Sequence, residues 1–171
     1  MSELNLPGVA AVRSTRKGIA GDGLIHPASV IALVTLIVND HVLKASLPGV
    51  LTGKLSDFAG LLMFPLLLQA GYEIVTHMLG SFDRPSKTVL ATSVVVTGLV
   101  FSLVQFDAGF ADAYRVLMGH AQAPLSIVGL QEPNRVALTQ DAMDLVALPS
   151  LIIAWFVGFR RIRFWTGDGR P

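Results

Sequence analysis

The sequence predicts an all-α integral membrane protein, a bundle of four transmembrane helices with a short amphipathic interfacial helix between the third and the fourth. Three observations lead to this fold class. The chain of 171 residues is 52% hydrophobic, and its mean hydropathy is +0.60. Only 15% of its residues are charged, whereas a soluble domain carries roughly 25%. The apolar residues also gather into four blocks, each close to the ~20 residues that a helix needs to cross a bilayer.

Four apolar blocks predict the transmembrane helices. The first ends in polar residues, the third contains no charged residue, and the fourth carries Asp144 in its first turn. Pro65 in the second block and Pro149 in the fourth predict kinks or weakened turns, which membrane helices tolerate because neighbouring helices satisfy the freed carbonyls. The predicted spans are residues 28–47, 57–79, 88–106 and 142–159.

The segments outside these blocks predict two tails, two turns and one longer connection. Residues 1–27 have no long apolar run and predict a flexible basic tail rather than a signal peptide, and residues 160–171 predict a second basic tail. Residues 44–56 and 80–86 contain glycine and proline and predict turns. Within residues 107–141, apolar side chains recur at the spacing of one helix face, which predicts an amphipathic helix in the interface. These side chains are Phe110, Tyr114, Leu117 and Met118.

Lysine and arginine predict the orientation, because they are retained on the cytoplasmic side of a membrane. Four spans put both tails and residues 80–86 on one side. That side has nine cations and five acids, a net charge of +4, whereas the opposite side has four cations and seven acids, a net charge of −3. The sequence therefore predicts a multi-pass protein of the cell inner (plasma) membrane with both termini in the cytoplasm.

Polar residues gather where the four spans meet the outer interface. The first span contains a polar stretch near its end, Lys54 precedes the second, the third runs directly into Asp107, and the fourth opens with two aspartates. Ionisable groups in membrane segments are costly and face the bundle interior, where they pair. We therefore expect one polar site at this level, with Asp40, Asp57 and Asp144 as candidate catalytic residues. The rest of the predicted cluster is Asn39, His41, Lys44, Lys54, Asp107 and Asp141.

Helical spacing predicts two pairs within this cluster. Asp40 and Lys44 stand at positions i and i+4, so they can share one helix face. Asp141 and Asp144 stand at i and i+3 and also face together.

The helix dipole favours some of these positions and disfavours others. Asp57 falls in a predicted first turn, where the positive end of the dipole stabilises an anion. Asp40 and Asp107 fall at predicted C-terminal ends, where the dipole disfavours an anion. We therefore expect Lys44 or Lys54 to compensate these two carboxylates.

Four interpretations of the cluster remain open. In the first, the charges only end helices and set the topology. In the second, Asp57 with Asp144, or Asp40 with Asp144, activates water in a membrane-embedded hydrolase that acts on a lipid or lipid-linked substrate. In the third, His41 and nearby acids bind zinc or a harder divalent ion, although no His-x-x-x-His spacing supports a metal site. In the fourth, the protein is an ion-coupled carrier, which with four helices requires a homo-oligomer, or an accessory subunit of a membrane complex.

One short resemblance bears on the hydrolase interpretation. Asp40-x-x-x-Lys44, at the end of the first span, resembles a five-residue fragment of the lipoprotein signal peptidase pattern. The asparagine-rich motifs and the later catalytic aspartate motifs of that family are absent from the sequence, so the fragment does not assign the chain to it.

Several classes of function are excluded. The chain has no cysteine, which excludes thiol–disulfide and iron–sulfur chemistry. It has neither a Gly-x-Ser-x-Gly elbow nor a glycine-rich phosphate loop, and its charge balance of +1 is not that of a nucleic-acid-binding protein. The partner that the sequence predicts is the lipid bilayer, with a lipid-linked substrate under the hydrolase interpretation. It identifies no cofactor.

The predicted orientation can be tested with reporters fused to the C-terminus. We expect a reporter that is active only in the cytoplasm to give a signal and one that is active only in the periplasm to give none, because the Lys and Arg count places this end inside. The opposite result would refute the orientation.

Overall fold

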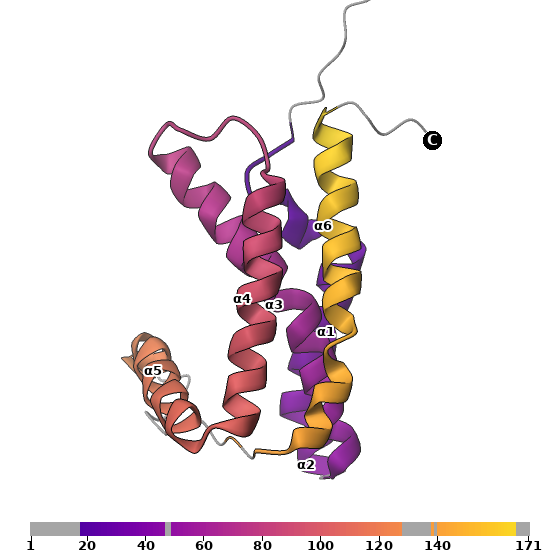
Figure 1. Ribbon diagram of the computed structural model, residues 1–171, viewed down its shortest axis with the longest axis vertical. Helices are drawn as coiled ribbons and strands as arrows, with labels where there is room; N and C mark the ends of the chain where they lie inside the picture. The colour runs from indigo at the N-terminus through magenta and orange to yellow at the C-terminus, as the bar shows by residue number, and fades with distance from the viewer. Residues whose placement is uncertain (1–17, 47–48, 128–137, 139, 167–171) are drawn as a thin grey trace, which may run out of the picture.

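The residues that the structure describes form helices joined by short turns, with no β-strand among them, and four of the helical segments are long and apolar enough to cross a membrane, which confirms the predicted all-α bundle. The computed structural model describes residues 18–46, 49–127, 138 and 140–166. Figure 1 shows α4 and α6 running along the long axis with α1, while the C-terminal part of α3 tilts away from them at one end and α5 leans away at the other.

Nine elements follow one another in the described part of the chain. In order they are the 3₁₀ helix η1 (Asp22–Ile25), α1 (Pro27–Val38), the π-helical turn η2 (Asn39–Leu43), α2 (Lys44–Ser46), α3 (Val50–Met78), α4 (Lys87–Phe106), α5 (Ala108–Ile127), the 3₁₀ helix η3 (Ala142–Ala147) and α6 (Ser150–Thr166).

Side-chain caps define where two of these helices, α1 and α4, begin. The His26 ring accepts a hydrogen bond from the N–H of Ala28 just before α1, where Pro27 takes the first helical position. The Ser86 hydroxyl caps α4.

Some helix ends differ from the sequence-based prediction. α3 begins at Val50, so Asp57 lies in the interior of the helix. The prediction that the dipole at the first turn stabilises the Asp57 carboxylate is therefore wrong. α3 stays continuous through Pro65. The interruption expected at Pro149 is confirmed, because η3 ends before it and α6 starts after it. α6 then continues to Thr166, so the first arginines of the expected basic tail are helical. The amphipathic helix expected between the third and fourth spans is present as α5.

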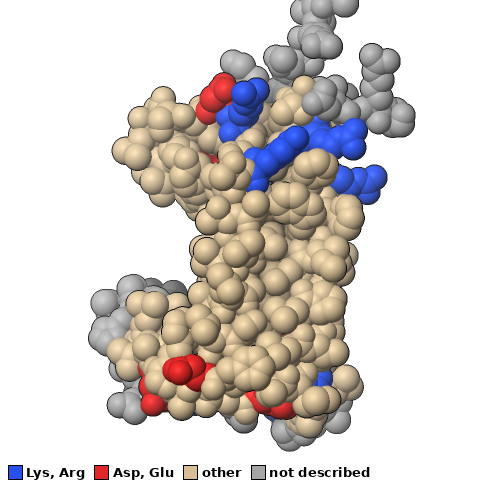
Figure 2. Space-filling view, viewed as in Figure 1, with Lys and Arg blue, Asp and Glu red and all other residues tan. Residues whose placement is uncertain are grey.

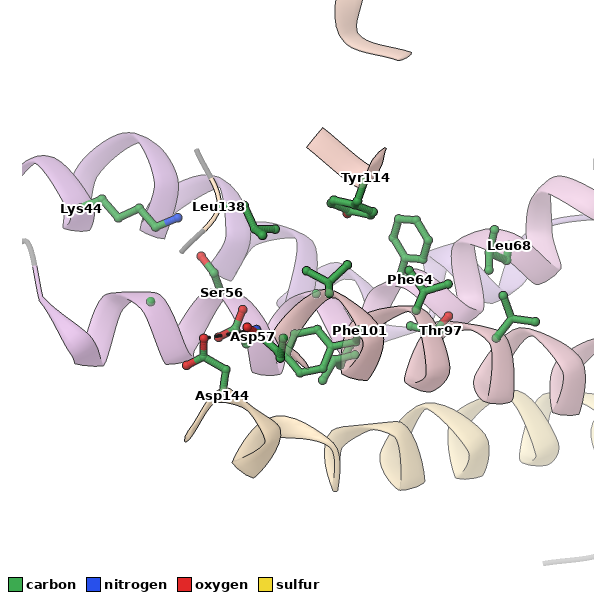
Figure 3. Close-up of a pocket in the computed structure, with 17 residues that line it drawn as sticks. Lys44, Ser56, Asp57, Phe64, Leu68, Thr97, Phe101, Tyr114, Leu138 and Asp144 are labelled. Carbon is green, nitrogen blue, oxygen red and sulfur yellow. Dashed lines mark hydrogen bonds between the residues drawn. The ribbon is translucent and has the colours of Figure 1, made fainter. Parts of the chain in front are cut away.

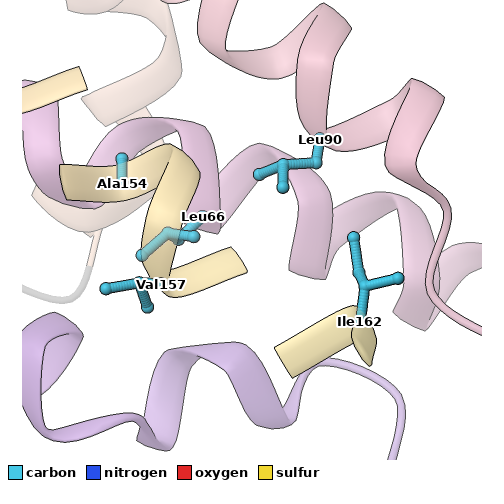
Figure 4. Packing of buried hydrophobic residues seen from close by; sticks show 5 residues of the cluster. All are labelled: Leu66, Leu90, Ala154, Val157 and Ile162. Carbon is cyan, nitrogen blue, oxygen red and sulfur yellow. The ribbon is translucent and has the colours of Figure 1, made fainter. Parts of the chain in front are cut away.

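Close packing of α3, α4 and α6 forms the apolar core. Gly158 of α6 permits this approach, since a Cβ atom there would lie 2.6 Å from a methyl carbon of Leu90. Such a contact is far below the ~3.5–4.0 Å optimum between carbon atoms. The buried cluster consists of Leu66, Leu90, Ala154, Val157 and Ile162 (Figure 4).

The charged residues separate toward the two ends of the bundle. In the face shown in Figure 2, Lys and Arg gather at one end and most of the Asp and Glu at the other, with an uncharged belt between them. The belt includes exposed apolar side chains such as Ile31, Leu99 and Phe156. We call the end with Arg84, Lys87 and Arg160 to Arg163 the basic end, and the end with Asp40, Asp57, Asp107 and Asp144 the acidic end.

A buried ion network closes the basic end. Glu73 of α3 is 1% exposed, and Arg161 of α6 donates two hydrogen bonds to its carboxylate, at 2.8 and 2.7 Å. Arg161 also donates to the carboxylate of Asp22. The Gln69 amide and the backbone N–H of Gly21 donate to Glu73 at 3.1 and 2.9 Å. Both oxygens of the buried carboxylate therefore have partners, as burial of a charge requires.

This network attaches the segment before α1 to the bundle. Gly21 has a φ of 81°, a conformation that favours glycine, and its N–H reaches Glu73. Residues 18–27 of the expected flexible tail are thus an integral part of the fold, whereas residues 1–17 lie outside the described residues. Arg161, which the sequence assigns to the second basic tail, instead points into the bundle.

Replacement of Arg161 tests the network. Arg161→Ala leaves the Glu73 carboxylate buried without a cation, and we expect a loss of about 3–5 kcal/mol of stability. Thermal unfolding of the purified protein in detergent measures this loss. Arg160→Ala, on the exposed neighbouring residue, is the matched control and should change stability by less than about 0.5 kcal/mol. Equal melting temperatures for the two variants would contradict a stabilising role of the network.

Candidate functional site

A cavity of about 470 Å³ lies between α3 and α4 (Figure 3). The two helices run in opposite directions along it, so its lining extends from Gly53 to Leu68 on α3 and from Gln105 to Val96 on α4. Tyr114 of α5 also lines it, together with Leu138 and Asp144. The cavity therefore starts at the acidic end and reaches the middle of the bundle.

One part of this cavity is polar and the remainder is apolar. Its apolar walls include side chains that are partly exposed, namely Phe64 at 40%, Leu68 at 38% and Val96 at 42%. An enclosed cavity would bury such residues, so the space is a groove that opens along one side. We call it the α3–α4 groove. Its polar lining consists of Lys44, Ser56, Asp57, Thr97, Gln105, Tyr114 and Asp144.

Two carboxylates stand side by side at the polar end of the groove. Figure 3 shows the side chains of Asp57 and Asp144 next to one another, the first from α3 and the second from η3. Lys54 of α3 forms an ion pair with Asp144 at 3.1 Å, and the Gln105 amide donates a hydrogen bond to the other oxygen of Asp144 at 3.3 Å. Asp144 is therefore held in one orientation by two neighbouring helices.

Asp57 and Tyr114 differ from the other polar groups of the groove. Neither side chain has a hydrogen bond or an ion pair with any other described residue, although both line the groove. Burial raises the pKa of the Tyr114 phenol above its usual value of 10.0, so the hydroxyl keeps its proton at neutral pH and can donate it in a hydrogen bond. The groove thus offers one acceptor and one donor that no described residue occupies.

The remaining polar lining residues are already occupied. Lys44 pairs with Asp40 at 2.7 Å, which confirms that these two share a helix face. The Thr97 hydroxyl donates to the Ser93 carbonyl within α4 at 2.7 Å. Gln105, besides its bond to Asp144, accepts from a backbone N–H at the start of the last span. These groups shape the groove and are not free to change partners without cost.

A second polar cluster lies beside the groove, where the first span meets α3. Asn39 is fully buried and donates to the Thr52 carbonyl at 2.8 Å and to the Ser56 hydroxyl at 2.6 Å. Ser56 in turn donates to Asp40 at 3.1 Å. Asn39 begins the π-helical turn η2, a local widening that is frequent at functional sites. Its side-chain oxygen has no hydrogen-bond partner in the described part of the chain.

The structure therefore brings some of the predicted site residues together at the α3–α4 groove and places others outside it. Asp57, Asp144, Lys44 and Lys54 meet at or beside the groove, whereas Asp40 lies outside its lining and connects to it through Ser56. The predicted pairing of Asp40 with Asp144 has no contact to support it among the described residues.

Two further aspartates cap helices. Asp107 was expected to need a lysine, but its carboxylate accepts a hydrogen bond from the N–H of Phe110 at 2.6 Å. Asp107 thereby caps α5, which begins at the next residue. That expectation is wrong because a new helix starts directly after α4, so the carboxylate meets a helix N-terminus instead of facing a C-terminus alone. Asp141 caps η3 in the same way through the N–H of Met143.

The metal interpretation gains no support from the described residues. His41 is exposed, and no group of three His, Cys, Asp or Glu residues in residues 18–46, 49–127, 138 and 140–166 could hold a metal ion.

Sequence reasoning missed Gln105, Ser56 and Tyr114 as site residues. Gln105 carried a signal, because it is an amide at the end of a span that otherwise offers no strongly polar side chain. Tyr114 was recognised as part of an amphipathic helix, but the packing of that helix beside the groove could not be read from its periodicity.

The chain matches no protein-family model, and no curated protein or solved structure matches it either. The groove is therefore characterised by its own contacts: a fixed carboxylate, an open carboxylate and an open phenol above an apolar channel.

Substitution of Asn39 and of His41 separates the buried cluster from the exposed surface. Asn39→Ala removes two hydrogen bonds between the first span and α3, and we expect it to cost about 1–3 kcal/mol. His41→Ala, two positions along the same turn, should change stability by less than about 0.5 kcal/mol. Thermal unfolding in detergent compares the two variants, and a larger loss for His41→Ala would contradict this assignment.

Proposed function

We propose that the protein is a multi-pass inner-membrane protein whose basic end and both termini lie in the cytoplasm. Four apolar segments and the uncharged belt between the two charged ends support this location. The arginines of the basic end follow the rule that cations remain on the cytoplasmic side. The acidic end, and with it the mouth of the groove, then faces the outer interface.

We further propose that the α3–α4 groove is the active site of a hydrolase that acts on a lipid or lipid-linked substrate. The observation that carries this proposal is the juxtaposition of Asp57 and Asp144 at the head of an apolar groove. A lipid substrate needs apolar walls for its chain and polar groups at the level of its head group. The groove has both, in that order, along one helix pair.

The two carboxyl groups can supply both proton transfers of a hydrolysis. Carboxyl groups that lie side by side share a proton, because their charges repel. One of them takes a proton from the attacking water while the other gives a proton to the leaving oxygen, which balances the cleavage of one bond by one water molecule. Lys54 and Gln105 orient Asp144 for this exchange, and Asp57 faces the substrate with no competing partner.

Activity measurements on carboxamide variants test the hydrolase proposal. The protein in nanodiscs is incubated with monoacylglycerols, glycerophospholipids, polyprenyl phosphates and polyprenyl diphosphates, and mass spectrometry detects the products. We expect turnover of at least one class, and a loss of about 100-fold or more for Asp57→Asn and for Asp144→Asn, because a missing acid–base group typically costs that much.

The matched control is Asp83→Asn, on an exposed carboxylate at the basic end. It should retain full activity. The double variant should be little worse than either single variant, since the two groups act as a unit. Turnover that survives both single substitutions, or no turnover of any of these lipids, would overturn the hydrolase proposal.

A further inference from the structure

We infer that the α3–α4 groove selects a single-chain amphiphile whose head group donates hydrogen bonds, and that it holds this one chain down to Leu68. The inference deepens the hydrolase proposal and rests on its membrane location, but it concerns binding and does not depend on hydrolysis.

The length of the groove matches the chain of one membrane leaflet. From Asp57 to Leu68, α3 rises about 16 Å at ~1.5 Å per residue. From Gln105 to Val96, the antiparallel α4 covers about 14 Å by the same measure. Half of a ~30 Å hydrocarbon core has the same depth. A chain that enters with its head at the acidic end thus reaches the end of the groove near the midplane.

The volume of the groove is sufficient for one chain. A methylene group is of the size of a water molecule, whose share of liquid volume is ~30 Å³. The cavity of about 470 Å³ therefore holds on the order of fifteen such groups. One chain of that number of groups extends over the whole length of the groove.

Glycines make one wall of the channel smooth. Gly53 and Gly60 of α3 line the groove, and a Cβ atom built on either meets no atom within 4 Å. The space beside them is therefore free for a ligand. Gly71, further along the same helix, also has open space beside it but does not line the groove. Gly60 and Gly71 form a matched pair for substitution.

Charge at the mouth of the groove determines the head group. Lys44 is paired with Asp40 and Lys54 with Asp144, so the positive charges there are compensated. Asp57 remains as an acceptor that forms no ion pair with a described residue, which favours a head group with hydroxyl or amine donors and repels a carboxylate. The Tyr114 hydroxyl, also without a partner in the described residues, can bond to an oxygen of the same head group.

Photocrosslinking tests this inference without requiring activity. The probe is a monoacylglycerol with a diazirine at the end of its chain, added to the protein in nanodiscs and mapped by mass spectrometry of the peptides. We expect crosslinks to concentrate near Leu68 of α3 and Val96 of α4. Gly60→Leu, which fills the channel, should reduce them at least about tenfold, and Gly71→Leu should leave them unchanged. An unlabelled monoacylglycerol should compete, whereas a fatty acid of equal chain length should not.

The result also separates this inference from the hydrolase proposal. Asp57→Asn should abolish hydrolysis but keep the crosslinks from the chain end in place. Crosslinks spread over the exposed belt, including Phe156 of α6, and insensitive to Gly60→Leu would overturn the inference even if hydrolysis is found. Crosslinks confined to the groove without any hydrolysis would uphold it and refute the hydrolase.

Discussion

The central helix α3 imposes one constraint on the whole molecule, because the charged and polar side chains that it carries into an apolar bundle need partners, several of which come from neighbouring helices. Glu73 accepts hydrogen bonds from Arg161 of α6 and from the backbone of the segment before α1. Ser56 accepts a hydrogen bond from Asn39 of η2. Lys54 forms an ion pair with Asp144 of η3. These contacts connect α3 to the first and last spans at both ends, and the apolar core between them completes the bundle.

Asp57 differs from these three residues, because it has no hydrogen bond or ion pair with a described residue. It is partly buried on the same helix, three residues from Lys54, yet Lys54 forms its ion pair with Asp144 instead. An acceptor left open beside a groove is costly for stability and useful for a ligand, and such exceptions are expected at functional sites. The open carboxylate, the fixed carboxylate and the apolar channel are thus parts of one arrangement, in which binding and catalysis share the same polar end.

Much of the fold could be predicted from the sequence, because length and hydropathy predict four long apolar helical segments and Pro149 predicts the break between η3 and α6. The division of charge between the ends was also readable. The start of α3 was not, since Leu55 and the residues before it resemble a turn in composition, and the contacts of Thr52 and Ser56 with Asn39 of η2 appear only in the folded bundle. The buried ion network around Arg161 was not predicted, for a related reason. Arg161 lies in a cluster of arginines that resembles a basic tail, and only the position of Glu73 in the folded bundle explains why its side chain points inward.

The candidate site was predictable as a location but not as an arrangement. The sequence placed Asp57 and Asp144 at the same level, yet it could not distinguish their pairing from that of Asp40 with Asp144, because helix rotation decides which carboxylates meet. Asp107 illustrates the same limit, since its role depends on whether a helix follows at once. Gln105 and Tyr114 entered the site through contacts between elements far apart in the chain.

Among the described residues, the fold leaves Asp57 open for a ligand at the head of the α3–α4 groove. A crystal structure grown from a monoacylglycerol mesophase tests this arrangement directly. We expect continuous chain density from Asp57 to Leu68, with a head-group hydroxyl in hydrogen-bond contact with Asp57. An Asp57 carboxylate in an ion pair with Lys54 or Lys44, above a groove filled by the protein's own side chains, would contradict it.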